Sequence, residues 1–174
     1  MGTVLLPPKI VAVQGPLVFL AGPIQGAPEW QADALRWLHA QAPDLAVASP
    51  RRQYPPGEFD YAAQVDWETH HLRRAARHGA ILFWLAREAV SVPGRCYSQT
   101  SRFELAEWKV RHERDGVRLV VGIEDGFSGA RYIRQRFRQD CPDVPLVASL
   151  EATCRAVVEL VRAQPSVEVD GPRE

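Results

Sequence analysis

The strongest constraint on the fold is a regular alternation between short apolar runs and longer segments with helical periodicity. The apolar runs occupy residues 17–21, 45–48, 80–85, 118–123 and 145–148. The segments with helical periodicity occupy residues 28–41, 61–77, 101–114, 130–138 and 150–162. Short runs with few polar residues are typical of strands that are buried on both faces. Because parallel strands need crossover helices, the alternation predicts a parallel sheet covered by helices on both sides.

These elements predict an α/β fold, a doubly wound parallel sheet of five strands. With right-handed crossovers the commonest strand order is 2-1-3-4-5. That order reverses between the first and third strands, and a ligand crevice is expected beyond their carboxyl ends. A chain of 174 residues has the size of one domain. We expect the domain to span residues 17–163, with an N-terminal extension at 1–16 and a flexible tail at 164–174.

Charge and cysteine content narrow the possible functions. The chain has 21 Lys and Arg against 21 Asp and Glu, so it lacks the basic footprint of a protein that binds nucleic acid or an anionic membrane. Its three cysteines are widely spaced and form neither a disulfide framework nor a CxxC metal site. No signal-peptide pattern or apolar stretch of about 20 residues is found. We expect a cytoplasmic protein without a nucleic acid polymer or a membrane as partner.

The loop after the first strand is the first candidate for ligand binding. It contains Gly22, Pro23, Ile24, Gln25 and Gly26 and leads into a helix. Glycines let the backbone turn tightly and approach a ligand, and free N–H groups near a helix start can bind an anion or sugar hydroxyls. The loop has too few glycines for a dinucleotide fingerprint, and a plain strand-to-helix turn remains an alternative.

The loop after the third strand, residues 87–100, is longer than the usual connection and leads to Glu104. The spacing of Ser101 and Glu104 fits a capping box, in which the glutamate only satisfies a backbone donor. In the functional interpretation, the helix dipole holds the carboxylate of Glu104 ionised in the first helical turn, aimed into the crevice as a nucleophile must be. Both interpretations use the same geometry.

A second carboxylate, Glu68, lies on the helix predicted at 61–77. If Val65, Leu72 and Ala76 form the buried stripe, Glu68 flanks the core face and Trp67 points nearly the opposite way. Partial burial would raise the pKa of Glu68 and suit it to donate a proton at neutral pH. Its alternative role is that of an ordinary partner for an arginine or a backbone amide. The outward direction predicted for Trp67 suggests a packing partner such as a second subunit.

Two other side chains of this helix, Gln64 and His71, share the side of Glu68 at spacings of four and three residues. A small polar cluster is therefore expected around Glu68. The remaining histidines are scattered, without the spacing of a zinc site, so no metal site is expected.

Four segments in the same order resemble the nucleoside 2-deoxyribosyltransferase-like family: FLAGPI at 19–24, QVDWE at 64–68, ILFWL at 81–85 and TSRFEL at 100–105. The resemblance covers roughly residues 17–125. It implies a flavodoxin-like (Rossmann-like) domain, commonly a homo-oligomer, that uses no metal or organic cofactor. It also implies that Glu104 is the nucleophile and that the loop after the first strand touches the sugar or its 5′ substituent. The partners implied are a nucleoside or nucleotide and a free base.

The implied chemistry is cleavage of the N-glycosidic bond of a 2′-deoxyribonucleoside. Glu104 would attack the anomeric carbon, the base would leave, and a second base would take the sugar from the covalent intermediate, with net retention of configuration. In the second loop, Tyr97, Ser98 and Thr100 are the candidates for contact with the substrate.

The sequence departs from the family at three places. Ser98 stands where well-characterised transferases have an aspartate, Ala106 replaces the glycine of their ELG motif, and 78–79 reads HG in place of AD. The position of the acid that assists the leaving base therefore cannot be carried over from the family to this sequence. We suggest Glu68 or Asp66 for this role instead.

Two alternatives stay open. In a nucleoside or nucleoside-monophosphate N-glycoside hydrolase, water replaces the acceptor base, and Arg51 and Arg52 could hold a 5′-phosphate. In a non-catalytic nucleotide-sensing module, the pocket would be kept and part of the catalytic set lost.

Overall fold

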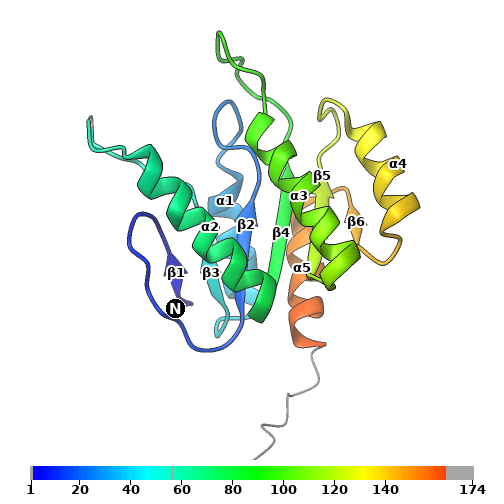
Figure 1. Ribbon diagram of the computed structural model, residues 1–174, viewed down its shortest axis with the longest axis horizontal. Helices are drawn as coiled ribbons and strands as arrows, with labels where there is room; N and C mark the ends of the chain where they lie inside the picture. Colours follow the sequence, from blue (N-terminus) through cyan, green and yellow to red (C-terminus); the bar gives the residue numbers. More distant parts are fainter. Residues whose placement is uncertain (1, 56, 164–174) are drawn as a thin grey trace, which may run out of the picture.

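The computed structural model describes residues 2–55 and 57–163 and shows one open sheet between two layers of helices (Figure 1). The strands are β1 (Val4–Leu5), β2 (Leu17–Ala21), β3 (Ala46–Ala48), β4 (Gly79–Leu85), β5 (Leu119–Ile123) and β6 (Leu146–Val147). The helices are α1 (Trp30–Gln41), α2 (Tyr61–His78), α3 (Gln99–Asp115), α4 (Ala130–Asp140) and α5 (Leu150–Arg162). Every strand pair is parallel. The α/β class and the parallel sheet are thus confirmed.

The sheet has six strands where five were expected, in the order β1-β3-β2-β4-β5-β6, so the order of the whole sheet differs from the expectation at one edge. Among themselves, the five expected strands, β2 to β6, keep the expected order 2-1-3-4-5. The additional strand, β1, lies in the segment expected to be an N-terminal extension and pairs with β3 at the edge of the sheet. Two residues are too few to show a strand period in the sequence, and backbone bonds such as that from the Val47 amide to the Thr3 carbonyl, at 2.9 Å, hold them in place.

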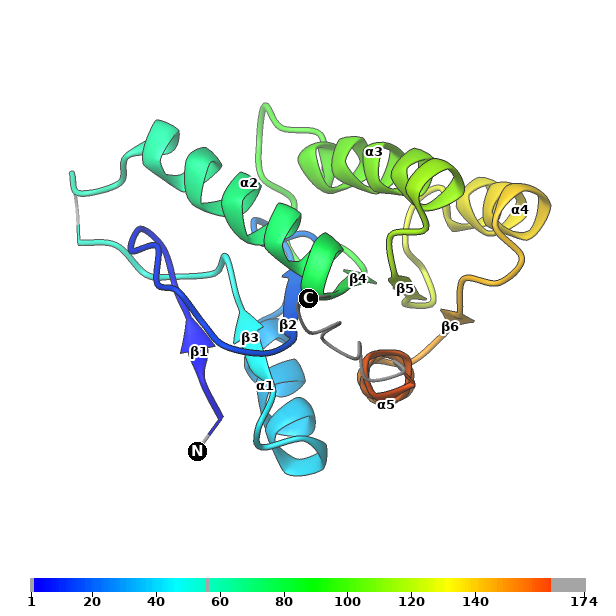
Figure 2. The ribbon, with the colours of Figure 1, turned by 60° about the horizontal axis from the view of Figure 1, so that its bottom comes forward.

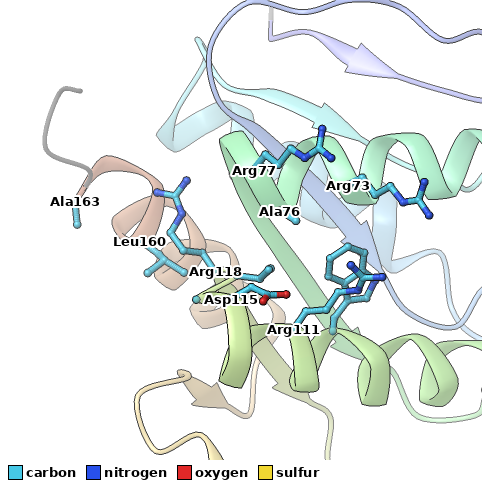
Figure 3. Close-up of a pocket in the computed structure, with 11 residues that line it drawn as sticks. Arg73, Ala76, Arg77, Arg111, Asp115, Arg118, Leu160 and Ala163 are labelled. Carbon is cyan, nitrogen blue, oxygen red and sulfur yellow. The ribbon is translucent and has the colours of Figure 1, made fainter. Parts of the chain in front are cut away.

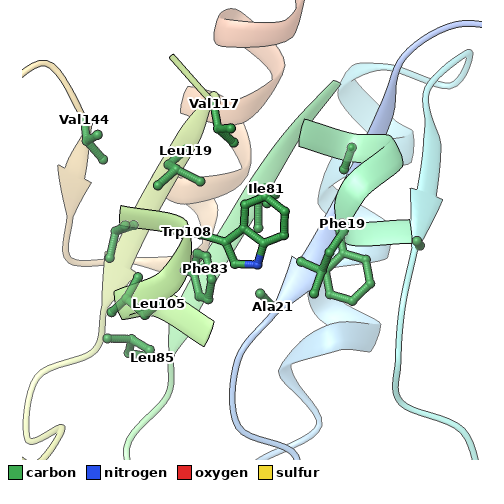
Figure 4. Packing of buried hydrophobic residues seen from close by; sticks show 14 of the residues in the cluster. Phe19, Ala21, Ile81, Phe83, Leu85, Leu105, Trp108, Val117, Leu119 and Val144 are labelled. Atoms are coloured by element: carbon green, nitrogen blue, oxygen red, sulfur yellow. The ribbon is translucent and has the colours of Figure 1, made fainter. Parts of the chain in front are cut away.

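Alternate side chains of the strands point into two hydrophobic cores, one on each face of the sheet. From β4, Ile81 and Phe83 join the cluster beneath α2, α3 and α4, whereas Leu82 and Trp84 join the cluster beneath α1 and α5. Figure 2 shows these two helical layers on opposite sides of the sheet. In Figure 4, Trp108 of α3 lies over residues of β4. Because every strand pair is parallel, the helices that follow β2, β3 and β4 begin at the carboxyl edge of the sheet.

Trp67 is buried, and the expectation that it points outward is wrong. Its side chain is fully covered, and its indole Nε1 donates a hydrogen bond to the carbonyl of Lys9 at 3.1 Å. Further along α2, Arg74 donates to the carbonyl of Val13 at 3.2 Å. The segment between β1 and β2 therefore crosses the face of α2 that carries Trp67, and the chain itself supplies the packing partner that we ascribed to a second subunit. Conversely Val65, expected in the buried stripe, is 39% exposed.

No helix in the two described ranges is long and apolar enough to cross a membrane. The tail expected at residues 164–174 lies outside the described residues.

Candidate functional site

Glu68 and Glu104 approach each other at the carboxyl edge of the sheet, from two neighbouring helices of the same layer. Both side chains are partly buried, and the charge of Glu68 acts directly on Glu104. The helix that carries Glu104 begins at Gln99, two residues earlier than expected, so Ser101 lies inside it and forms no cap. The capping-box interpretation is therefore wrong, and Glu104 belongs to the second helical turn.

The pKa of Glu104 is raised, whereas we expected the helix dipole to hold this carboxylate ionised. Burial raises the pKa of Glu104 to about 8, with further contributions from the negative charges of Glu68 and Glu107. The dipole acts mainly within the first turn of a helix, which Glu104 does not occupy. Near neutral pH this pair of carboxyl groups therefore holds a proton.

A hydrogen-bonded chain orients Glu68. Its Oε1 accepts from Gln64 Nε2 at 2.7 Å, and Gln64 Oε1 accepts from the Tyr54 hydroxyl at 2.8 Å. Gln64 Nε2 also donates to the carbonyl of Pro50 at 3.1 Å, which fixes the amide. Burial raises the pKa of Glu68, and the bond from Gln64 partly offsets that rise. The polar cluster expected around Glu68 thus contains Gln64.

Tyr54 was missed, because a tyrosine in a loop carries no periodic signal. His71 does not join the cluster: it is buried, its Nδ1 lies 2.8 Å from the carbonyl of Trp67, and burial lowers its pKa. Asp66, the alternative acid, is exposed to solvent on α2. Of the two candidate acids, only Glu68 interacts with Glu104 in the structure.

The loop after β2 packs against the loop after β4. The Gly26 carbonyl accepts from the amides of Ala89 and Val90, at 2.8 and 3.1 Å, and Gln25 Oε1 accepts from the guanidinium of Arg95. Gly26 has a φ of +74°, and a Cβ there would lie 2.6 Å from the carbonyl oxygen of Val90. Only glycine fits this contact between the loops.

The start of the loop after β2 is held by contacts with the hydrophobic core beneath α1 and α5. A Cβ on Gly22, where φ is +151°, would lie 2.2 Å from the carbonyl oxygen of Trp84. The Pro23 carbonyl accepts from Trp30 Nε1 at 2.8 Å, and Ile24 is partly buried. Backbone geometry therefore explains why glycine stands at positions 22 and 26, as expected if the loop is a plain strand-to-helix turn.

The three candidates of the second loop have different environments. Tyr97 donates its hydroxyl to the Ala86 carbonyl at 2.7 Å, and burial, with help from nearby carboxylates, raises its pKa to about 12. Ser98 is in the left-handed region, with φ 59°, and its buried Oγ has no hydrogen-bond partner within the described ranges. Thr100 is exposed. A strained residue with an unsatisfied hydroxyl, at the start of the helix that carries Glu104, is typical of a ligand site.

Replacing Tyr97 by Phe should lower the free energy of unfolding by about 1 kcal/mol, because the Ala86 carbonyl loses its hydroxyl donor. Urea denaturation measures this. Tyr61→Phe is the matched control, because the side chain of Tyr61 is 72% exposed. Equal effects of the two substitutions would contradict the role assigned to Tyr97.

The two arginines considered for a 5′-phosphate are engaged within the chain. Arg51 donates to the carbonyl of Pro28 at 2.8 Å and to Gln31 Oε1 at 3.1 Å. Arg52 donates to the carbonyl of Pro7 at 2.6 Å. Arg51 thus joins the segment after β3 to the start of α1, and Arg52 joins it to the segment after β1.

No protein-family model matches the chain, and a search of curated proteins finds no match. Within residues 2–55 and 57–163, no group of three or more His, Cys, Asp or Glu side chains could hold a metal ion.

Proposed function

We infer that this protein cleaves the N-glycosidic bond of a 2′-deoxyribonucleoside and transfers the sugar to another base. The observation that carries this proposal is the pair of Glu68 and Glu104, in which the charge of one carboxylate raises the pKa of the other. Glycosidic-bond cleavage with retention uses two carboxyl groups, one ionised for attack and one protonated for the leaving group. The resemblance of the segments around these residues to nucleoside 2-deoxyribosyltransferases supports the same chemistry.

In the proposed reaction the pair holds one proton, and the reactive form carries it on Glu68. A carboxylate oxygen of Glu104 forms a bond with the anomeric carbon as the bond from that carbon to the base nitrogen breaks. The electron pair stays on the base, which takes the proton from Glu68. A nitrogen of a second base then forms a bond with the anomeric carbon as the bond from that carbon to the Glu104 oxygen breaks. The electron pair of the broken bond returns to the Glu104 carboxylate, and the incoming base gives a proton to Glu68. Two displacements retain the configuration.

The surrounding residues have supporting roles in this mechanism. Gln64, held by Tyr54 and the Pro50 carbonyl, orients the carboxyl group of Glu68. The hydroxyl of Ser98, which has no hydrogen-bond partner among the described residues, forms a hydrogen bond with the substrate in this proposal. The loop containing Gly22 and Gly26 forms one wall beside the sugar.

Product analysis tests the proposal directly. The protein is incubated with each deoxynucleoside and its 5′-monophosphate, with and without a second free base, and the mixtures are separated by chromatography. We expect a new nucleoside that appears only when the acceptor base is present. Free base released at the same rate without an acceptor would replace transfer by hydrolysis. Unchanged substrates at high protein concentration, together with nucleotide binding by calorimetry, would contradict both enzymatic functions and favour the sensing module.

A further inference from the structure

A groove at the opposite edge of the sheet from Glu104 gathers four arginines. It has a volume of about 940 Å³, in the range of small-molecule sites. Its walls are the C-terminal parts of α2 and α3, the residues that lead into β5 and the end of α5 (Figure 3). The arginines and the single carboxylate among the lining residues are Arg73, Arg77, Arg111, Arg118 and Asp115. In a chain with equal numbers of basic and acidic residues, this is a strong local excess of positive charge.

For Arg73, Arg77 and Arg111, the ion pairs of the described residues leave most of this charge in place. Asp115 forms an ion pair with Arg114 at 3.3 Å. Arg114 is not one of the residues that line the groove. Arg111 forms an ion pair with Glu107, at 2.8 Å, and its guanidinium stacks on the ring of Trp108. Arg73 and Arg77 have no ion pair within the part of the chain that the structure describes.

Helix dipoles explain only part of this arrangement. Helices α2 and α3 end at this edge, and a cation in a last helical turn is favourable. Arg77 lies in the last turn of α2, but Arg73 and Arg111 precede the last turns of their helices. Arg73 and Arg77, one turn apart on α2, therefore line the groove with no ion pair to another residue of the ranges 2–55 and 57–163.

We propose that this groove binds a small molecule that carries a chain of two or more phosphates. Guanidinium groups bind phosphate oxygens through paired, charge-assisted hydrogen bonds, and several of them spread along a groove match successive phosphates. A single phosphate would contact only part of the arginine set. The concave shape and the neutral net charge favour a small molecule over the backbone of a nucleic acid.

Calorimetric titration with inorganic tripolyphosphate tests this site. Tripolyphosphate should bind the protein about tenfold or more tightly than orthophosphate does. The double variant Arg73→Gln/Arg77→Gln should bind it about tenfold or more weakly than the wild type. Arg131→Gln/Arg138→Gln, on the exposed side of α4, removes the same charge elsewhere and should leave binding unchanged. Glu104→Gln should also bind normally, which separates this groove from the carboxylate site.

A second measurement needs only the wild-type chain. Modification by phenylglyoxal, read by mass spectrometry, should be slowed by tripolyphosphate at Arg73 and Arg77 and not at Arg131 and Arg138. An equal or tighter affinity for a deoxynucleoside triphosphate would support the proposal and identify a nucleotide as the source of the phosphate chain. Absence of tripolyphosphate binding, or equal losses in the two double variants, would overturn it. An oligonucleotide that binds through Arg73 and Arg77 and is not displaced by tripolyphosphate would overturn it in favour of nucleic acid.

Discussion

Replacing Glu104 by Gln should lower the rate of glycosidic-bond cleavage about a thousandfold or more. The amide has nearly the shape of the carboxyl group but cannot attack the anomeric carbon to form the ester intermediate. Removal of a covalent nucleophile is among the largest single losses known in enzymes. The measurement is single-turnover release of base from the best deoxynucleoside found by product analysis.

Glu113→Gln is the matched control, because it makes the same change at an exposed position near the other end of α3. It should retain full activity.

Correct folding of Glu104→Gln is checked by its unfolding free energy at alkaline pH. Because the pKa of Glu104 is raised from 4.5 to about 8, the folded wild type keeps a proton that the unfolded chain has lost between these values. Wild-type stability therefore falls as pH rises through this window, and Glu104→Gln escapes that loss. A folded variant with full base-exchange activity would exclude Glu104 as the nucleophile.

The elements of the central sheet could be predicted because their apolar runs are long enough to show a pattern. Strand β4, whose seven residues are all buried, was found within one residue. Strand β1 has two residues, and its place depends on pairing with β3, which lies more than forty residues later in the chain. Such a contact leaves no local signal, so the prediction missed this edge strand, while the other five strands follow the expected order.

The direction of Trp67 was misjudged because the buried stripe of α2 was placed on the wrong side of the helix. The stripe was taken through Val65, Leu72 and Ala76, whereas the buried residues are Gln64, Trp67, His71, Leu72 and Ala75. These lie on one face at helical spacing, and the Trp67 ring packs against Phe19 of β2, with the ring centroids 6.1 Å apart. Two of the buried positions hold polar side chains, Gln64 and His71, so the hydrophobic pattern of the sequence does not mark this face.

At the candidate site, the identities of Glu68 and Glu104 could be predicted, but their proton affinity could not. The sequence places Glu104 near a helix start and so predicts a lowered pKa. The structure moves it to the second turn, buries it and adds the charge of Glu68, and these effects raise the pKa. Gln64 could be found from its spacing to Glu68, whereas Tyr54 reaches Gln64 from a loop without a pattern.

The raised pKa predicts a bell-shaped dependence of kcat/KM on pH. The reactive form of the pair has one proton, for the leaving base, and one negative charge, for attack. Loss of the last proton, at a pKa of about 8, removes the acid, so that kcat/KM should fall about tenfold for each further pH unit. Protonation of both groups removes the nucleophile, and because the pKa of Glu68 is also raised, the acid limb should lie above the ordinary value for a glutamate. Initial rates at low substrate concentration across the pH range measure the profile.

Glu68→Gln distinguishes this shared proton from a single titration. Without the acid, the alkaline fall should disappear, leaving a weak activity that rises with pH as Glu104 ionises. Its midpoint should lie below 8, because one of the charges that raise the pKa of Glu104 has been removed, while burial, the larger cause, remains. Glu107→Gln is the matched control: it removes another of these charges and should move the alkaline limb slightly to lower pH without loss of the maximal rate. An alkaline limb that persists in Glu68→Gln would assign the proton to Glu104, which would then be the acid of the reaction and not its nucleophile.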